Sequence, residues 1–338
     1  MERMEAAAIL ALRPVEARIL FPGDAAQVAA RFRELARQWH PDRNPGVDVS
    51  VFARIVELHG IARDAGSTTS TIPTRILKGY DGRAYRFGYR KAHATDFGET
   101  LVGMRTIVHV VPVDLRDLAD RAAAFVPTFA DDGMRTEMER FLPRRTREIA
   151  LADGGMAFVE AKEPDQVLLR DLMALAPFDP RHAAWIATRL VNVACWLDWA
   201  GIAHGAIGPD SLLVSAETHG VGITGPFLTA TRYGERFGAL PARTLDERPG
   251  AGRDGAVADA GLDPALVRLT TRECLGDPSG AALRFDAGFP KPFANWLTTP
   301  AANGARADFP AWERARDASF GERRFVKWDV DPAALMAA

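Results

Sequence analysis

Cysteine is scarce in this chain, which has only Cys195 and Cys274 among its 338 residues. Neither cysteine belongs to a Cys-x-x-Cys pair, so the sequence contains no zinc knuckle and no sign of a disulfide framework, and a reducing compartment fits this usage. No cluster of histidine and acidic residues has the spacing of metal ligands. We therefore expect no metal and no cofactor.

Long hydrophobic runs are also missing. No stretch of about 18 apolar residues, the length that crosses a bilayer as a helix, occurs in the sequence. The most apolar long segment, residues 183–207, is interrupted by Arg189 and Asp198 and indicates a buried core helix. Glu2 and Glu5 stand where a signal peptide would carry positive charge. We expect a cytoplasmic protein without a membrane partner.

Neither sign of charge dominates the sequence. The formal net charge is -2, from 42 basic and 44 acidic residues, so bulk charge gives no support to nucleic-acid binding. Only five of the basic residues are lysines, a bias typical of a GC-rich bacterial or phage gene. The composition, 47% hydrophobic and 25% charged, is that of a globular protein long enough for two or three domains.

Two amphipathic helices are predicted near the N-terminus. From Asp24, a suitable N-cap, apolar residues recur every three or four positions as far as Trp39. Pro41 disfavours helical geometry in the residue before it, so this helix should end at His40. A second apolar stripe predicts a helix over 49–64, and the two helices should form a hairpin. The side chains expected in its core are Val28, Phe32, Trp39, Phe52, Ile55 and Leu58.

The tripeptide His40-Pro41-Asp42 joins these two helices. It follows Arg37-Gln38-Trp39 and precedes Arg43-Asn44-Pro45. This order of helix, His-Pro-Asp and helix resembles the J domain of the DnaJ family, over about residues 14–66. The resemblance implies that the tripeptide docks on a DnaK-type heat-shock chaperone and stimulates its ATPase. The short basic fourth helix and the zinc-binding cysteine-rich region found in the family are not visible in this sequence.

The chemistry of the tripeptide suits docking. Pro41 restricts the backbone, so the loop loses less entropy on binding, and Asp42 offers a charged acceptor to an arginine of the partner. Arginines nearby would meet an acidic partner surface, raise the association rate and set orientation. The alternative is a plain hairpin with a solvated basic face, in which the histidine only caps a helix. The expected chaperone-binding residues are His40, Pro41, Asp42, Arg31, Arg33, Arg37 and Arg43.

A second, larger domain should follow the hairpin. A Gly/Ser/Thr-rich stretch predicts a linker at 67–73 after a first domain at 1–66. Strand patterns come first and helical patterns after them, which indicates an α+β fold in two lobes: a strand-rich small lobe at 74–161, a helical large lobe at 162–330, then a tail at 331–338. The predicted strands are 75–77, 84–90, 99–102, 106–111, 147–151, 156–161, 211–214 and 220–223. The predicted helices are 115–125, 132–142, 165–175 and 180–200.

One segment of the expected large lobe resembles the catalytic loop of protein kinases. Residues 199–214 read Trp-Ala-Gly-Ile-Ala-His-Gly-Ala-Ile-Gly-Pro-Asp-Ser-Leu-Leu-Val and follow the predicted long helix. The positions that match the family pattern are His204, Gly205, Ile207, Pro209, Leu212 and Leu213. Asp263 resembles the structural aspartate at the start of a large-lobe helix. The resemblance implies a protein-kinase-like fold over about residues 73–330.

Several positions of this frame are degenerate. Ala206 stands where the family has its catalytic aspartate, Gly208 replaces a lysine, and Ser211 replaces the metal-binding asparagine. Gly225 belongs to a Gly-Ile-Thr-Gly-Pro segment that stands where the family has its metal-binding aspartate. We expect these positions, together with a structural His204, to preserve the shape of the site without its chemistry.

The missing groups have no replacements nearby. No lysine occurs between positions 91 and 162, no aspartate between 210 and 246, and no asparagine between 192 and 295. Asp96-Phe97-Gly98 has the letters of the family's metal motif but precedes the third strand, so it cannot serve as that motif. One catalytic group of this kind is commonly worth about 10²–10⁴-fold in rate. The sequence therefore predicts a pseudokinase, in which a hydrophobic purine slot could still bind nucleotide without metal.

Three functions remain open. The first, our principal hypothesis, is a co-chaperone or adaptor that recruits a DnaK-type chaperone and uses its catalytically inactive kinase-like domain to bind a client or partner protein. The second is an atypical, nucleotide-binding kinase-like enzyme that uses displaced residues. The third is a structural scaffold of bacterial or phage origin.

Overall fold

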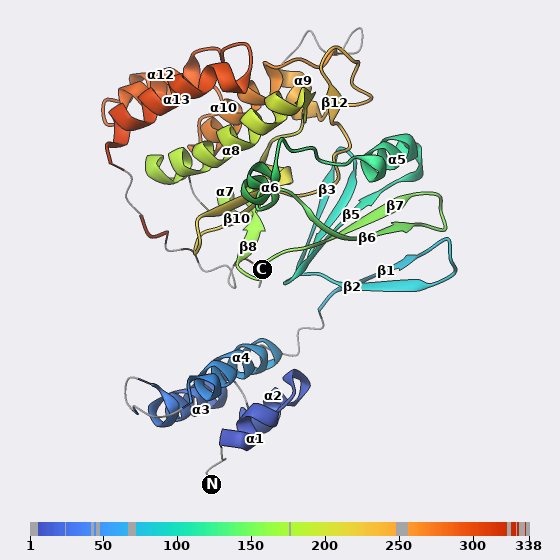
Figure 1. Ribbon diagram of the computed structural model, residues 1–338, viewed down its shortest axis with the longest axis vertical. Helices are drawn as coiled ribbons and strands as arrows, with labels where there is room; N and C mark the ends of the chain where they lie inside the picture. The colour runs from blue at the N-terminus through green and yellow to red at the C-terminus, as the bar shows by residue number, and fades with distance from the viewer. Residues whose placement is uncertain are drawn as a thin grey trace. The chain divides into compact units, whose positions relative to one another are not determined.

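The computed structural model describes residues 6–23, 25–41, 44, 48–66, 72–175, 177–247, 256–322, 326–328, 330 and 335. The chain divides into two compact units, Met1–Ile72 and Pro73–Ala338 (Figure 1). Each unit has a hydrophobic core of its own. Residues 67–71 of the expected linker, and all of the expected tail except Leu335, lie outside the described residues.

The first unit is helical. Its elements are α1 (Ala6–Ala11), a 3-10 turn η1 (Pro14–Glu16), α2 (Ala17–Leu20), α3 (Ala25–Trp39) and α4 (Val49–Gly66). Both predicted helices are present, and α3 ends one residue before His40, because Pro41 follows. Figure 1 shows α3 beside α4, and α1 and α2 also pack against α4.

The core of the first unit lies along one stripe of α4. Its buried residues are Ile9, Ala17, Leu20, Phe21, Val28, Leu35, Val51, Ile55, Leu58 and Ala62. Phe32 and Trp39 are partly buried and pack against this core, as predicted. Phe52 was predicted to belong to the core and does not: it is half-buried beside the stripe that runs from Val51 to Ala62. The reason is geometric, since a residue next to a stripe position is turned about 100° away from it.

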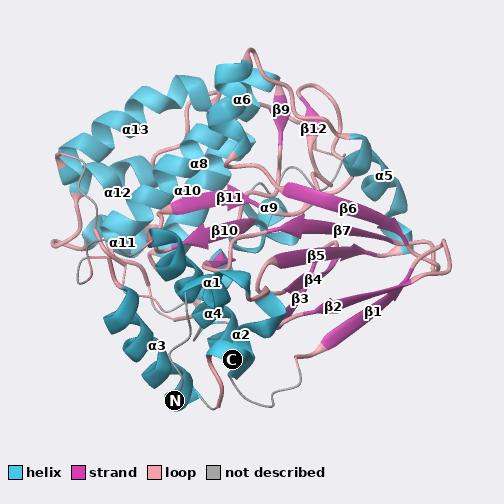
Figure 2. Ribbon diagram, turned by 60° about the horizontal axis from the view of Figure 1, so that its bottom comes forward, coloured by secondary structure: helices cyan, strands magenta, loops and turns pink. Residues whose placement is uncertain are grey.

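The second unit begins with strands. A five-stranded antiparallel sheet has the order β3-β4-β5-β7-β6, and β1 and β2 form a separate hairpin (Figure 2). The bounds are β1 Thr74–Lys78, β2 Ala84–Gly88, β3 Lys91–Thr95, β4 Gly98–Val102, β5 Thr106–Val111, β6 Arg144–Ala150 and β7 Met156–Ala161. Strand β3 was not predicted, because the apolar residues of Lys-Ala-His-Ala-Thr are two alanines, which favour strands only weakly.

The two faces of this sheet pack against different parts of the unit. On the outer face, Leu101, Val108 and Val159 form a cluster with Leu77 of the β1–β2 hairpin. On the inner face, other strand residues belong to the same core as the helices that follow in the sequence; these are Val102 and Ile107. The inner face therefore adjoins the helical part directly, and any cleft between the two parts must lie there.

Three helical elements lie between β5 and β6: η2 Val113–Leu115, α5 Arg116–Ala124 and α6 Asp132–Glu139. The helical part that follows the sheet consists of β8 Gln166–Leu168, α7 Leu169–Met173, α8 Pro180–Ala200, β9 Ile202–Ala203, η3 Pro209–Ser211, β10 Leu212–Ser215, β11 Gly220–Ile223, β12 Thr231–Arg232, α9 Ala242–Glu247, α10 Leu262–Cys274, α11 Ala281–Phe285, α12 Lys291–Thr298 and α13 Ala305–Phe320. The second unit thus begins with strands and ends with helices, and the predicted α+β class is confirmed. The predicted helix over 165–175 is wrong in its first part: β8 pairs with β10, with Leu168 opposite Leu213.

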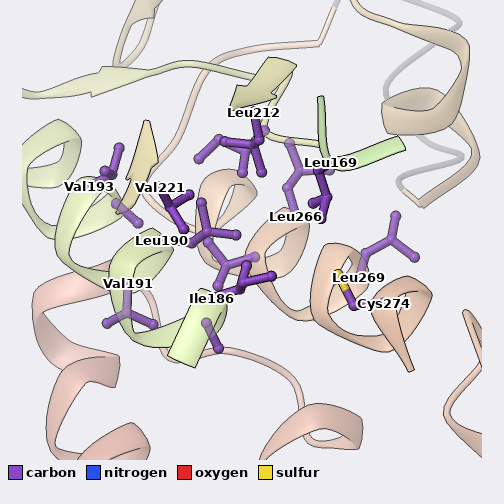
Figure 3. Close-up of a cluster of buried hydrophobic side chains, with 14 of the residues drawn as sticks. Leu169, Ile186, Leu190, Val191, Val193, Leu212, Val221, Leu266, Leu269 and Cys274 are labelled. Atoms are coloured by element: carbon purple, nitrogen blue, oxygen red, sulfur yellow. The ribbon is translucent and has the colours of Figure 1, made fainter. Parts of the chain in front are cut away.

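Helix α8 lies at the centre of the helical part. Asp179 caps its first turn by accepting the backbone N–H of Arg181 at 2.8 Å, and Gly201 ends it with a φ of 67°. Figure 3 shows Leu190 of α8 among side chains from α10 and β11, including Leu266 and Val221. Within the described residues, neither α8 nor any other helix is long and apolar enough to cross a membrane.

Candidate functional sites

The first candidate site is the loop that begins at His40. The backbone N–H of His40 donates to Ala36 O at 3.0 Å, so the last helical turn extends to this residue. The imidazole meets the Phe52 ring edge-on, with 4.9 Å between centroids. Asn44 closes the loop: its N–H donates to His40 O at 3.1 Å, and its Nδ2 donates to Gln38 O at 2.8 Å. Phe52 and Asn44 therefore hold the histidine at the end of α3, a role that sequence reasoning did not give them.

The tripeptide that was expected to dock on a chaperone is described only in part. His40 and Pro41 are both half-buried, whereas Asp42 and Arg43 lie outside the described residues. The expected role of the full set stays a prediction.

The arginines of α3 do not share one face. Arg33 and Arg37 are four residues apart and exposed, and each Nε donates to a backbone carbonyl one turn back, those of Ala29 and Arg33. Arg31 points to another side of the helix, where its guanidinium pairs with Glu34 at 2.8 Å. The single basic face predicted from the sequence is thereby reduced to Arg33 and Arg37 among the described residues.

The second candidate site lies below the sheet, in the loop between α8 and β10. His204 and Gly205 open this loop, and their backbone N–H groups donate to the two carboxylate oxygens of Asp263, at 2.7 and 2.9 Å. Asp263 is the second residue of α10 and is 4% exposed. The structural contact expected for this aspartate is therefore present in the geometry.

The degenerate positions of the loop bond to one another. The hydroxyl of Ser211 donates to Ala206 O at 2.6 Å and accepts the N–H of Gly208 at 3.1 Å. The guanidinium of Arg243 donates to Ile207 O at 2.9 Å from outside the loop. Ser211, which was expected at a metal-binding position, thus has its hydroxyl engaged in holding the loop backbone.

A buried polar cluster that sequence reasoning missed lies above this loop. His109, in the middle of β5, bonds through Nδ1 to Thr100 Oγ1 at 3.0 Å and through Nε2 to Thr224 Oγ1 at 3.1 Å. The Thr224 hydroxyl donates to Glu160 at 2.8 Å, and the N–H of Gly225 donates to the same carboxylate at 3.1 Å. Glu160 is 1% exposed. The signal in the sequence was the position of His109. It is a polar residue on the same face of β5 as the apolar residues that point inward.

The hydrogen bonds assign the proton of His109. Burial lowers the pKa of His109, and nearby Glu160 only partly opposes this, so the ring is neutral near pH 7. Thr224 spends its proton on Glu160 and therefore accepts from Nε2–H of the ring, which leaves Nδ1 to accept from Thr100. The hydrogen bonds of the cluster then run continuously from β4 to the segment after β11, and each donor in them meets an acceptor.

Further polar contacts join the sheet to the helical part. Asp171 of α7 lies 3.3 Å from Lys91 Nζ and 3.4 Å from His93 Nε2, both on β3. Burial alone would raise the pKa of Asp171, but His93 and Lys91 together outweigh it and lower the pKa. At the other end of β3, a carboxylate oxygen of Asp96 accepts the N–H of Ala242 at 3.1 Å. These ion pairs and this hydrogen bond connect the sheet to the helical part at several separate points.

The space left between sheet and loop is small. A pocket of about 130 Å³ lies there, below the roughly 300 Å³ at which ligand pockets usually begin. Asp96, Glu99 and Asp210 line it, and so does Arg243, whose guanidinium is already bonded to Glu273 at 2.7 and 2.8 Å. Within the described residues, no group of three or more His, Cys, Asp or Glu could hold a metal ion.

The chain is similar to solved structures, but not to a known family model or to a curated protein. Among solved structures, the kinase domain of Mycobacterium tuberculosis PknI is similar to this chain, with 13% sequence identity and a TM-score of 0.43. The match covers 65% of this chain and 92% of the PknI domain.

Proposed function

We propose that this protein is an adaptor. Its first unit docks on a DnaK-type chaperone in the manner of a J domain and stimulates the chaperone's ATPase. Its second unit is a kinase-like body that holds a client or partner protein and does not transfer phosphate.

The observation that carries the docking half is the placement of His40. The residue ends α3 with its ring against Phe52, and Asn44 closes the loop behind it. A side chain held in place before binding loses less entropy when it docks. Arg33 and Arg37, which form no ion pair within the described residues, add a basic stripe on the same helix, suited to an acidic partner surface.

The second half of the proposal, that the second unit does not transfer phosphate, is supported by the residues found at positions where protein kinases have catalytic groups. In protein kinases the third strand carries a lysine and a later aspartate holds magnesium. Here β5 is the third strand of the sheet and carries a neutral His109, and the segment opposite it presents Thr224 and Gly225. Both are hydrogen-bonded within a buried chain to Glu160, so the site is satisfied without a ligand.

The charge and the volume of the pocket between the sheet and the loop also favour a unit that does not transfer phosphate. Three carboxylates, those of Asp96, Glu99 and Asp210, line a pocket of about 130 Å³, and Arg243 is already paired with Glu273. Glu99 is paired with Arg75 and Asp210 with Arg170, so the described residues that line the pocket offer a triphosphate no unpaired cation, and the carboxylate of Asp96 would repel it. We therefore assign the unit a binding role through its surface.

The docking proposal is tested by chaperone turnover. The purified full chain should raise the ATPase rate of a DnaK-type chaperone, and His40→Gln should abolish that stimulation while the unfolding transition of the first unit stays unchanged. His93→Gln, on β3 of the other unit, serves as the matched histidine control and should stimulate normally. Stimulation that survives His40→Gln would overturn the proposal.

An atypical nucleotide-binding enzyme is the alternative, and a separate experiment distinguishes it. Incubation with γ-labelled ATP and magnesium should transfer no label to the chain or to added protein. Label transfer would contradict the pseudokinase assignment, whereas binding of ATP without transfer would not.

A further inference from the structure

The second unit contains a larger pocket that shares no lining residue with the cleft described above. Its volume is about 380 Å³, inside the range of roughly 300–1,000 Å³ common for small-molecule sites. One face of α8 forms a wall, and the turn between β10 and β11, the end of α13 and Val326 complete it. The residues that matter for its chemistry are Arg181, Trp185, Arg189, His219, Arg316 and Phe320.

Aromatic rings shape one side of this pocket. Trp185 stacks on His219 with 4.5 Å between centroids, and its Nε1 donates to His219 O at 3.0 Å. His219 has a φ of 52°, a left-handed conformation that suits its place in the turn between β10 and β11 and that histidine adopts more readily than most residues. The polar end of the indole is thus satisfied by the turn, which leaves the apolar parts of Trp185 and Phe320 to face a ligand.

Arginine supplies the charge of the pocket. The described residues that line the pocket include three arginines and one carboxylate. These are Arg181, Arg189, Arg316 and Glu322. Arg316 lies 2.8 Å from Asp317, its neighbour on α13, and is largely neutralised by that pair. Arg181 is exposed and forms no ion pair within the described part of the chain. Burial lowers the pKa of His219, so the positive charge near pH 7 comes from guanidinium groups.

We propose that this pocket binds a small anionic molecule that carries a flat apolar ring, an aromatic carboxylate or phosphate. The ring lies against Trp185 and Phe320, and the anionic group bonds to Arg181, whose planar donors match carboxylate and phosphate oxygens. The proposal depends neither on the His40 loop nor on the cleft below the sheet, so it stands or fails independently of the adaptor function.

Calorimetric titration of the full chain tests it, with adenosine 5′-monophosphate and indole-3-acetate as ring-bearing anions. Adenosine and inorganic phosphate are the counter-probes, since each has only half of the required chemistry. At least one ring-bearing anion should bind with Kd below about 1 mM, and both counter-probes should bind at least about tenfold more weakly. Binding should also weaken as sodium chloride is raised.

Arg181→Glu is the decisive variant. It should weaken binding at least about tenfold, because it replaces the attracting charge with a repelling one. The fold should tolerate it, since an acidic residue suits the first turn of α8. Arg232→Glu, an exposed arginine on β12 outside the pocket, is the matched control and should bind as the native chain does.

Three results would overturn the proposal. The first is the absence of heat and of a thermal shift with every ring-bearing anion at about 5 mM, a concentration that reveals even weak sites. The second is undiminished binding to the Arg181→Glu chain. The third is equal affinity for inorganic phosphate, which would show that the rings contribute nothing.

Discussion

The carboxylate of Asp263 accepts the backbone N–H of His204 at 2.7 Å, across 59 positions of sequence. A second N–H, that of Gly205, reaches the other oxygen at 2.9 Å. Burial raises the pKa of Asp263 to about 6, and these two hydrogen bonds oppose the rise. One buried side chain at the start of α10 therefore fixes the entry of the loop between α8 and β10.

Asp263→Asn should destabilise the second unit by about 2–3 kcal/mol. The amide keeps one acceptor oxygen but turns an NH₂ group towards the other N–H, which leaves two buried donors facing each other. Urea unfolding followed by circular dichroism measures the loss. Asp246→Asn, at an exposed position of α9, should change stability by less than about 0.5 kcal/mol. Equal stability of the two variants would contradict the role of Asp263.

His204 should make stability depend on acid pH. Burial lowers its pKa from 6.5 to about 4, so its contribution is fully present above pH 6.5 and is lost as pH falls towards 4. Asp263 acts in the opposite direction, because its raised pKa gives a contribution that is present below about pH 4 and lost as pH rises through 6.

His204→Asn separates the two titrations. Between pH 6.5 and 4 the native chain should lose about 3 kcal/mol relative to this variant, which lacks the His204 titration and keeps the others, that of Asp263 included. Denaturant unfolding at several pH values gives the difference directly. A difference that does not change with pH would show that His204 is not the titrating group.

Glu160→Ala should destabilise the junction between sheet and helices by about 2–4 kcal/mol. The substitution leaves the Thr224 hydroxyl and the N–H of Gly225 buried without their acceptor. Glu148→Ala, on the neighbouring strand β6 and partly exposed, is the control, because its pairing with Arg145 is at the surface. Thermal unfolding of both variants tests the difference, and a similar small effect in each would argue against a satisfied buried chain.

Arg33→Glu with Arg37→Glu should slow association with the chaperone by about tenfold or more at low salt, with a smaller effect at high salt. Arg31→Gln should leave the rate nearly unchanged, since Arg31 lies on another side of α3 and is paired with Glu34. Stopped-flow or surface-based kinetics at two salt concentrations make the comparison. If Arg31 mattered as much as the exposed pair, the assignment of the basic stripe would be wrong.

Asn44→Ala should reduce chaperone stimulation several-fold without unfolding the first unit. The amide of Asn44 donates to Gln38 O at 2.8 Å, so its loss frees the loop that holds His40 and raises the entropy lost on docking. Steady-state ATPase assays alongside helical circular dichroism measure both effects. Val56→Ala, at an exposed position of α4, is the control.

Local patterns in the sequence were sufficient for much of the fold. The end of α3 followed from Pro41, and the bounds of β5, β7, β11 and α8 were predicted as the structure has them. These elements are recognisable because periodicity, caps and proline act over a few residues. Asp263 was expected to be structural, but its hydrogen bonds to the loop that begins at His204 were not predicted, because they join positions 58 and 59 residues apart.

Other elements depended on partners distant in the sequence. Strands β3 and β8 have no clear alternation of their own and exist because β4 and β10 pair with them. Phe52 was placed in a core that its angle on α4 excludes. In each case the deciding contact is made by another segment, so local propensity could not reveal it.

The sequence by itself determined which chemical groups this protein has, among them the imidazoles of His40 and His204 and the small residues Ala206, Gly208 and Ser211 of the loop after α8. Only the tertiary structure decided how the remaining polar groups are used. It brought His109, Thr224 and Glu160 together from β5, the segment after β11 and β7, and it placed Arg181 beside Trp185 at the edge of a pocket. The physical reason is that a buried polar group must find its partner wherever the packed chain supplies one, and that partner is chosen by the fold and not by neighbours in the sequence.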